Sequence, residues 1–116
     1  MIIKDIIALL EASLHTGSDK LERDVSAVCG SDLMSDVMAF VKDEAVLLTG
    51  LVSLQTLRTA IVMDMGVVVL VRGKRPSPEM IELASENGIV LLSTGHTMFI
   101  ACGRLYQAGL RDGGKH

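Results

Sequence analysis

Small, hydroxyl-bearing and cationic residues recur directly after three apolar runs of this sequence. Thr49-Gly50 follows the first run, Arg72-Gly73-Lys74-Arg75 the second and Ser93-Thr94-Gly95-His96 the third. Glycine lets the backbone approach a ligand closely, while hydroxyls and cations suit an anion such as phosphate. The sequence therefore predicts a site for a phosphorylated molecule, although the same residues also build ordinary turns. The candidate ligand-binding residues are Thr49, Gly50, Arg72, Gly73, Lys74, Ser93, Thr94 and His96.

Two arrangements could support catalysis, and each has a structural interpretation beside it. Asp32 and Asp36 lie four residues apart on an expected helix, so their carboxylates would share a face, either for acid–base or metal chemistry or as a cap and a solvated surface. His96 close to Ser93 and Thr94 suggests a base with a nucleophile, but no G-x-S-x-G elbow and no orienting acid lie nearby. The two nucleotide-binding glycine fingerprints are also missing. We therefore expect a protein that is not an enzyme and has no catalytic residues and no cofactor.

The cysteines and histidines give no sign of a metal site. Cys29 and Cys102 form no C-x-x-C pair and have no metal-ligand spacing to the histidines, and His15 has no informative neighbour. Two small buried apolar side chains in a reducing cytoplasm are the expected arrangement.

Continuous apolar runs at 45–49, 67–71 and 89–92 predict the strands that position the candidate site. Runs without polar alternation are typical of strands buried on both faces, as in a parallel sheet. Ligands of such sheets bind beyond the carboxyl ends of the strands, where the three polar segments would meet. Shorter strands are expected at 13–16 and 25–29.

Helices are expected between and around these strands. Ile3, Ile6, Ile7 and Leu10 share one face of a first helix, and Ser31 or Asp32 would cap a second that presents Leu33, Val37, Met38 and Val41. Further helices would begin after Ser53, after Ser77 with Pro78 at its first position, and near Thr97. The last would carry Phe99, Cys102 or Gly103, and Tyr106 on one face. The sequence predicts an α/β fold with three α/β/α layers, a mostly parallel central sheet and a single compact domain.

Composition narrows the range of partners. Of the 116 residues, 49% are hydrophobic, and only 3% are aromatic. Such aliphatic excess favours an oligomer, most simply a homodimer. The net charge of −3 argues against nucleic acid, and no signal peptide or membrane-spanning stretch is evident, so a cytoplasmic location is expected. Residues 1–111 would form the domain, with 112–116 as a flexible tail.

Several of these segments together resemble the DRTGG domain family. They are the Lys4–Ile7, Ser31–Met38 and Ile89–Thr94 stretches, the Arg72-Gly73-Lys74-Arg75-Pro76 segment and the closing 101–106 helix. The resemblance implies a fold similar to the N-terminal domain of HPr kinase/phosphorylase. It also implies a non-catalytic regulatory or dimerising role, as in the DRTGG domains that accompany CBS domains in regulated pyrophosphatases. Many members carry a glycine pair after the central strand, where this chain has Gly73 and Lys74.

Two functions follow as hypotheses. One is a regulatory interaction module that homodimerises and docks to a larger redox or signalling protein. The alternative is a small-ligand sensor that binds a nucleotide or another phosphorylated metabolite at the strand ends.

Overall fold

The fold is built on a sheet with the strand order β1-β5-β4-β3-β2-β6, seen in the computed structural model, which describes residues 1–40 and 45–112. All neighbouring strands in this part of the chain are parallel except β1, which pairs antiparallel with β5. The strands are β1 (Ser13–Thr16), β2 (Ala27–Gly30), β3 (Val46–Thr49), β4 (Val67–Leu70), β5 (Val90–Ser93) and β6 (Arg111–Asp112). The mostly parallel sheet predicted from the sequence is confirmed.

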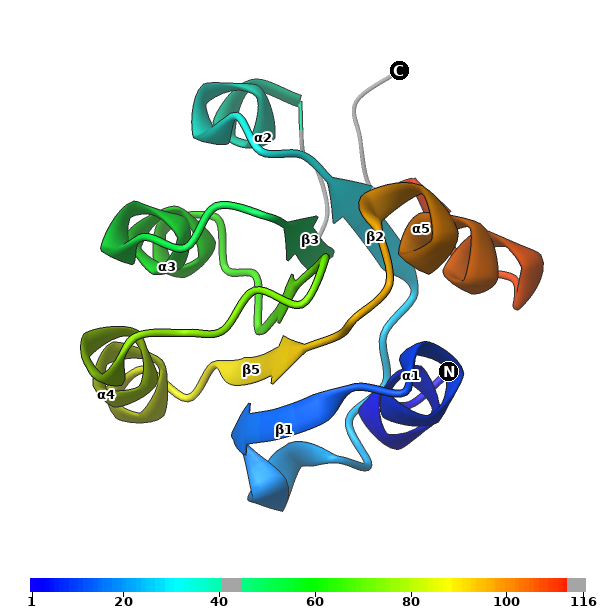
Figure 1. Ribbon diagram of the computed structural model, residues 1–116, viewed down its shortest axis with the longest axis horizontal. Coiled ribbons are helices and arrows are strands. Elements are labelled where there is room, and N and C mark those ends of the chain that lie inside the picture. The colour runs from blue at the N-terminus through cyan, green and yellow to red at the C-terminus, as the bar shows by residue number, and fades with distance from the viewer. Residues whose placement is uncertain (41–44, 113–116) are drawn as a thin grey trace.

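Helices cover both faces of the sheet, which gives the three α/β/α layers (Figure 1). The helices are α1 (Ile3–Leu10), α2 (Met34–Phe40), α3 (Leu54–Val62), α4 (Pro78–Glu86) and α5 (Met98–Gln107), with a 3-10 turn η1 at Ser18–Lys20. Helices α2, α3 and α4 lie on one face, and α1 and α5 lie on the other (Figure 1). No helix within the described residues is both long and apolar enough to span a bilayer.

Two apolar cores follow from the continuous hydrophobic runs. Side chains alternate along each strand, so Leu47, Val68 and Leu91 enter the core under α2–α4, while Val46, Val69 and Leu92 enter the core under α1 and α5. Strands that alternate apolar and polar residues expose one face of a sheet to solvent. The uninterrupted apolar runs here therefore require helices on both faces of the sheet.

Local signals set most helix starts as predicted. The hydroxyl of Ser53 accepts a hydrogen bond from the backbone N–H of Gln55, and that of Ser77 accepts one from Met80. Thr97 caps α5 in the same way. Such caps satisfy N–H groups that have no partner within the helix.

The α2 region differs from the prediction. The helix begins at Met34, so Asp32 precedes it, and the expectation that Asp32 and Asp36 share a helical face is wrong. Met34 and Val37 are the side chains that α2 buries, whereas Leu33 and Met38 are exposed. The cause is tertiary, because the Asp32 carboxylate bonds to the end of β3 and holds the preceding segment out of the helix. Val41 lies outside the described residues.

Strand β6 extends the sheet into the segment predicted as a tail. Asp112 pairs in register with Val28, and Arg111 with Ala27. The four residues after Asp112 lie outside the part that the structure describes.

Candidate functional site

The carboxyl ends of β3, β4 and β5 do meet at one edge of the sheet, and the turn after β4 stands at their centre. Arg72 and Gly73 both have positive φ, of 60° and 71°, and the N–H of Lys74 donates to the carbonyl of Val71 over 3.2 Å. Positive φ at two successive positions is the signature of a type I′ turn, which glycine adopts freely and arginine only at a cost of about 1–2 kcal/mol. Arg72 is therefore held in a strained conformation.

The loop after β5 supplies the bonds that hold this strained turn. The carbonyl of His96 accepts the Arg72 N–H at 2.7 Å, and the carbonyl of Thr94 accepts the Gly73 N–H at 2.9 Å. Thr94 and His96, both predicted site residues, therefore hold the turn that carries Arg72 through their backbone carbonyls. Strain that the surroundings impose at a loop tip is common at binding sites.

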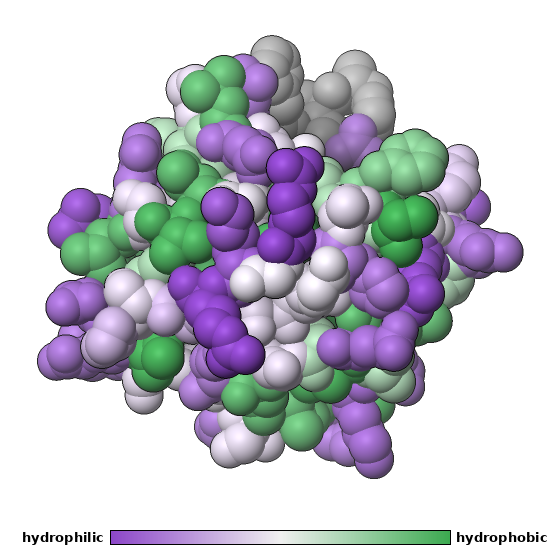
Figure 2. Space-filling model, viewed as in Figure 1, coloured by the Kyte–Doolittle hydropathy of each residue, from purple (hydrophilic) through white to green (hydrophobic). Residues whose placement is uncertain are grey.

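A cleft of about 180 Å³ opens beside this turn. Its lining residues are Asp32, Gly50, Val71, Arg72, Lys74 and Met98. Three of the eight predicted residues, Gly50, Arg72 and Lys74, therefore share one concavity. The side chains of Arg72 and Lys74 are exposed, and neither forms an ion pair or side-chain hydrogen bond with another described residue. Figure 2 shows strongly hydrophilic side chains gathered over the middle of the face that looks toward the viewer.

Asp32 is the residue of this cleft that the sequence prediction did not include. One carboxylate oxygen, Oδ1, accepts the backbone N–H of Gly50 at 2.6 Å and the hydroxyl of Thr49 at 3.2 Å. The backbone N–H of Gly50, which the sequence analysis assigned to an anionic ligand, therefore already donates to the Asp32 carboxylate. Asp32 follows β2 at the same sheet edge, so the strand-end rule that selected the other residues could have found it. Met98 carried no comparable signal.

The buried threonines of the predicted site are structural. Thr49 is fully buried, and its hydroxyl also accepts the N–H of Leu51. Thr94 is 3% exposed, and its hydroxyl donates to the carbonyl of Leu10 at 2.6 Å while accepting the N–H of His96. Neither hydroxyl is free for a ligand.

Ser93 and His96 point to different neighbours, which separates the suggested nucleophile and base. The hydroxyl of Ser93 bonds to Nε2 of His15, 2.8 Å away across the β1–β5 pair. Burial lowers the pKa of His15, and the positive charge of Arg75 lowers it further, so its ring favours the neutral form. His15, which had no partner in the sequence, is therefore the histidine that contacts Ser93.

His96 belongs to a surface cluster with Glu11 and Arg104. Nε2 of His96 lies 3.1 Å from Oε1 of Glu11, and Nη1 of Arg104 donates to the same oxygen at 3.2 Å. The hydrogen bond from His96 and then that from Arg104 lower the pKa of the Glu11 carboxyl. This cluster joins the end of α1 to α5, and none of its three residues lines the cleft.

The other polar groups form no metal centre in the described residues. No three His, Cys, Asp or Glu side chains gather there as a metal site requires. Burial raises the pKa of both thiols, Cys29 and Cys102, which keeps them protonated and weakly nucleophilic.

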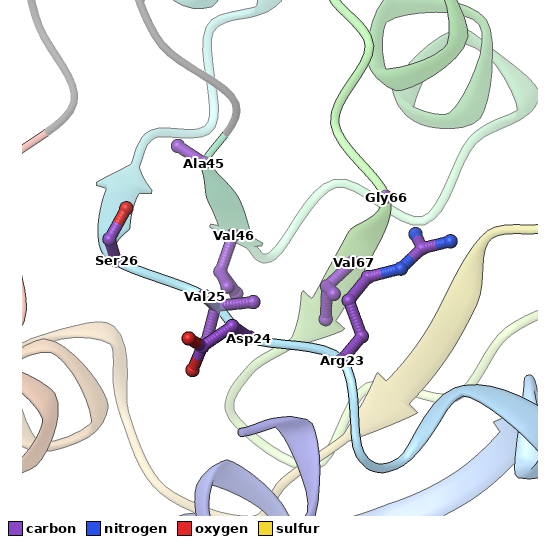
Figure 3. A pocket seen from close by; sticks show the side chains of 8 residues that line it. All are labelled: Arg23, Asp24, Val25, Ser26, Ala45, Val46, Gly66 and Val67. Carbon is purple, nitrogen blue, oxygen red and sulfur yellow. The ribbon is translucent and has the colours of Figure 1, made fainter. Parts of the chain in front are cut away.

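A second hollow lies at the amino ends of β3 and β4, at the edge of the sheet opposite the cleft. It holds about 120 Å³, and Val25, Val46 and Val67 project into it (Figure 3). The Arg23 side chain lies across Gly66, where a Cβ would come within 2.8 Å of Nη1 (Figure 3). Arg23 also lines a neighbouring hollow together with Ala60, Ile61 and Asp64, near the carboxyl end of α3.

Comparison with known proteins extends the fold assignment. No protein-family model and no curated protein matches this chain. One similar solved structure is that of the CBS and DRTGG domains of the regulatory region of Clostridium perfringens pyrophosphatase, complexed with its activator, diadenosine tetraphosphate. The TM-score is 0.76 at 20% identity, over 92% of this chain and 46% of that one, so the chain spans about half of its length. The DRTGG-like fold expected from the sequence is confirmed.

Proposed function

We propose that this protein is a non-catalytic regulatory module whose strand-end cleft binds a nucleotide or another phosphorylated metabolite. The observation that carries the proposal is the pair of exposed cations, Arg72 and Lys74, which flank the cleft without an acidic partner among the described residues. An arginine kept in a strained turn beside a concavity suits an anion that approaches from solvent. The similar pyrophosphatase region is regulatory and was solved with a nucleotide activator, which supports the same class of role here.

A catalytic role has less support. Ser93 and His15 resemble a nucleophile and a base, but within residues 1–40 and 45–112 no acid orients the imidazole, and the pair does not line the cleft. Their hydrogen bond has a structural use, because it ties the antiparallel edge strand β1 to β5.

The test is a thermal-shift screen with nucleotides and phosphorylated metabolites. A ligand present at about a hundred times its Kd stabilises the folded state by about 2.7 kcal/mol, which is readily detected. We expect the double variant Arg72→Ala/Lys74→Ala to lose the shift. The matched control is Lys4→Ala/Arg58→Ala, which removes two exposed cations from α1 and α3. Equal loss in both variants, or no shift with any ligand at millimolar concentration, would contradict the proposal.

A second candidate function, homodimerisation, is favoured by an apolar groove along α5. The groove encloses about 430 Å³ between α5, β2 and β6, with Val28, Cys102 and Leu110 among its lining residues. Phe99 projects beside it with 83% of its surface exposed, and Tyr106 with 62%. Hydrophobic side chains are visible over α5 in Figure 2. A surface that offers both a projecting ring and a hollow can pair with a second copy of itself about a twofold axis.

Sedimentation velocity at micromolar concentration tests the dimer. We expect Phe99→Glu to shift the protein to monomer, whereas Val62→Glu, at an exposed apolar position on α3, leaves the dimer intact. A wild-type protein that sediments as a monomer at this concentration would contradict the second candidate function.

A further inference from the structure

The strand-end cleft offers two different chemistries on its walls, which a simple phosphate site does not need. Arg72 and Lys74 supply cations, while Asp32 supplies a carboxylate, and no ion pair joins the acid to either base. An acid beside a phosphate site weakens phosphate binding through like-charge repulsion. A ligand that uses all three side chains must therefore carry hydrogen-bond donors as well as an anionic group.

The carboxylate of Asp32 is fixed and only half used. Its Oδ1 accepts from Gly50 and Thr49, whereas no described residue donates to Oδ2. A Cβ at Gly50 would lie 3.4 Å from Oδ1, which is an ordinary van der Waals contact, so the Asp32 side chain lies directly against this backbone. Asp32 is exposed, and its second oxygen is thereby available as an oriented acceptor.

The remaining lining is apolar and the enclosed space is small. Met98 contributes a half-buried thioether side chain, which suits the face of an aromatic base. The volume of about 180 Å³ lies below the range of about 300–1,000 Å³ typical of pockets for whole drug-sized ligands. The cleft therefore suits the phosphorylated sugar of a larger molecule whose remainder lies over its rim.

We propose that the cleft takes a ribonucleoside phosphate, with Asp32 accepting the ribose hydroxyls and Arg72 and Lys74 receiving the phosphate. A carboxylate commonly accepts the hydroxyls of a bound ribose, and arginine and lysine are the usual phosphate ligands. Met98 then faces the base. This inference rests on the proposed ligand-binding function and adds the identity of the ligand class and the role of Asp32.

The charge of Asp32 provides a test in which AMP and inorganic phosphate are expected to respond differently to the same substitution. With its oxygen still bonded to the Gly50 N–H, an asparagine at this position presents an NH₂ donor where the carboxylate accepts. By calorimetry, we expect Asp32→Asn to weaken AMP binding on the order of tenfold or more, because charge-assisted hydrogen bonds are lost. The same substitution should leave inorganic phosphate binding unchanged or tighter. Asp36→Asn, which removes an exposed carboxylate from α2, is the matched control.

A second test compares two ligands, AMP and 2′-deoxy-AMP, on the wild-type protein, so it does not depend on the folding of a variant. AMP should bind several-fold more tightly than 2′-deoxy-AMP, and Asp32→Asn should remove that preference. If 2′-deoxy-AMP binds as well as AMP, or Asp32→Asn binds AMP as tightly as the wild type, the ribonucleotide assignment is overturned. The proposed function survives that result if another phosphorylated ligand binds and depends on Arg72 and Lys74, and it fails if none binds or if binding does not depend on these two residues.

Discussion

Replacing Thr94 with valine tests whether this predicted site residue holds the fold together instead of binding a ligand. The substitution keeps the shape of the side chain and removes its hydroxyl. That hydroxyl donates to the Leu10 carbonyl at 2.6 Å and accepts from the His96 N–H at 3.2 Å, at a position only 3% exposed. Leu10 ends α1, so its carbonyl has no partner within the helix.

The expected cost follows from these two bonds. A buried acceptor left without a partner costs about 1–3 kcal/mol, and the His96 N–H, which lies nearer the surface, can turn to water. We expect Thr94→Val to lower the free energy of unfolding by about 2 kcal/mol, or about 8 °C in Tm at roughly 4 °C per kcal/mol for a domain of this size. Ligand affinity should be unchanged, because the hydroxyl is not available to the cleft.

Urea unfolding followed by circular dichroism measures this, since the chain has no tryptophan to report by fluorescence. The control is Thr59→Val on α3, an identical substitution at 4% exposure where the hydroxyl makes no hydrogen bond to a described residue. Because this substitution breaks no hydrogen bond between described residues, it should lower the free energy of unfolding by less than Thr94→Val does. If both variants unfold at the same urea concentration, the structural role assigned to the Thr94 hydroxyl is wrong.

Two further outcomes are expected. An NMR titration should give His15 a pKa below its ordinary value of about 6.5, because burial and then Arg75 disfavour the charged ring. Its contribution to stability is present above about pH 6.5 and is lost as the pH falls, and a midpoint above that value would refute the assigned surroundings. Gly17→Ala should destabilise by about 3 kcal/mol or more, since φ is +93° and the new Cβ would lie 2.9 Å from Cα of Val90. Gly109→Ala, also at positive φ but with nothing within 4 Å, should cost about 1 kcal/mol by thermal unfolding, and equal losses would rule out the predicted contact.

Short-range patterns in the sequence predicted the α/β architecture of the protein. The predicted apolar runs at 45–49, 67–71 and 89–92 form β3, β4 and β5, which are buried on both faces apart from the half-buried Ser93. Ser53 and Ser77 cap the helices that were expected to follow the first two. Apolar runs and helix caps depend on residues a few positions apart, so they can be recognised in the sequence without knowledge of the fold. The same holds for the strand-end rule, which brought Gly50, Arg72 and Lys74 to one cleft.

The hydrogen-bond partners of individual polar side chains could not be predicted from such short-range patterns. Asp32 was paired with Asp36 by helical spacing, but its carboxylate reaches Gly50, 18 residues away. His96 was matched with Ser93 by proximity in the sequence, yet Ser93 bonds to His15 at a separation of 78 residues.

What the sequence by itself determined is thus most of the helices and strands and the sheet edge at which Gly50, Arg72 and Lys74 meet, because burial and capping depend on residue type and short-range spacing. The tertiary structure alone decided which hydroxyls are consumed internally and which charges remain exposed. A hydrogen bond depends on distances that the chain sets only after distant strands have been brought together.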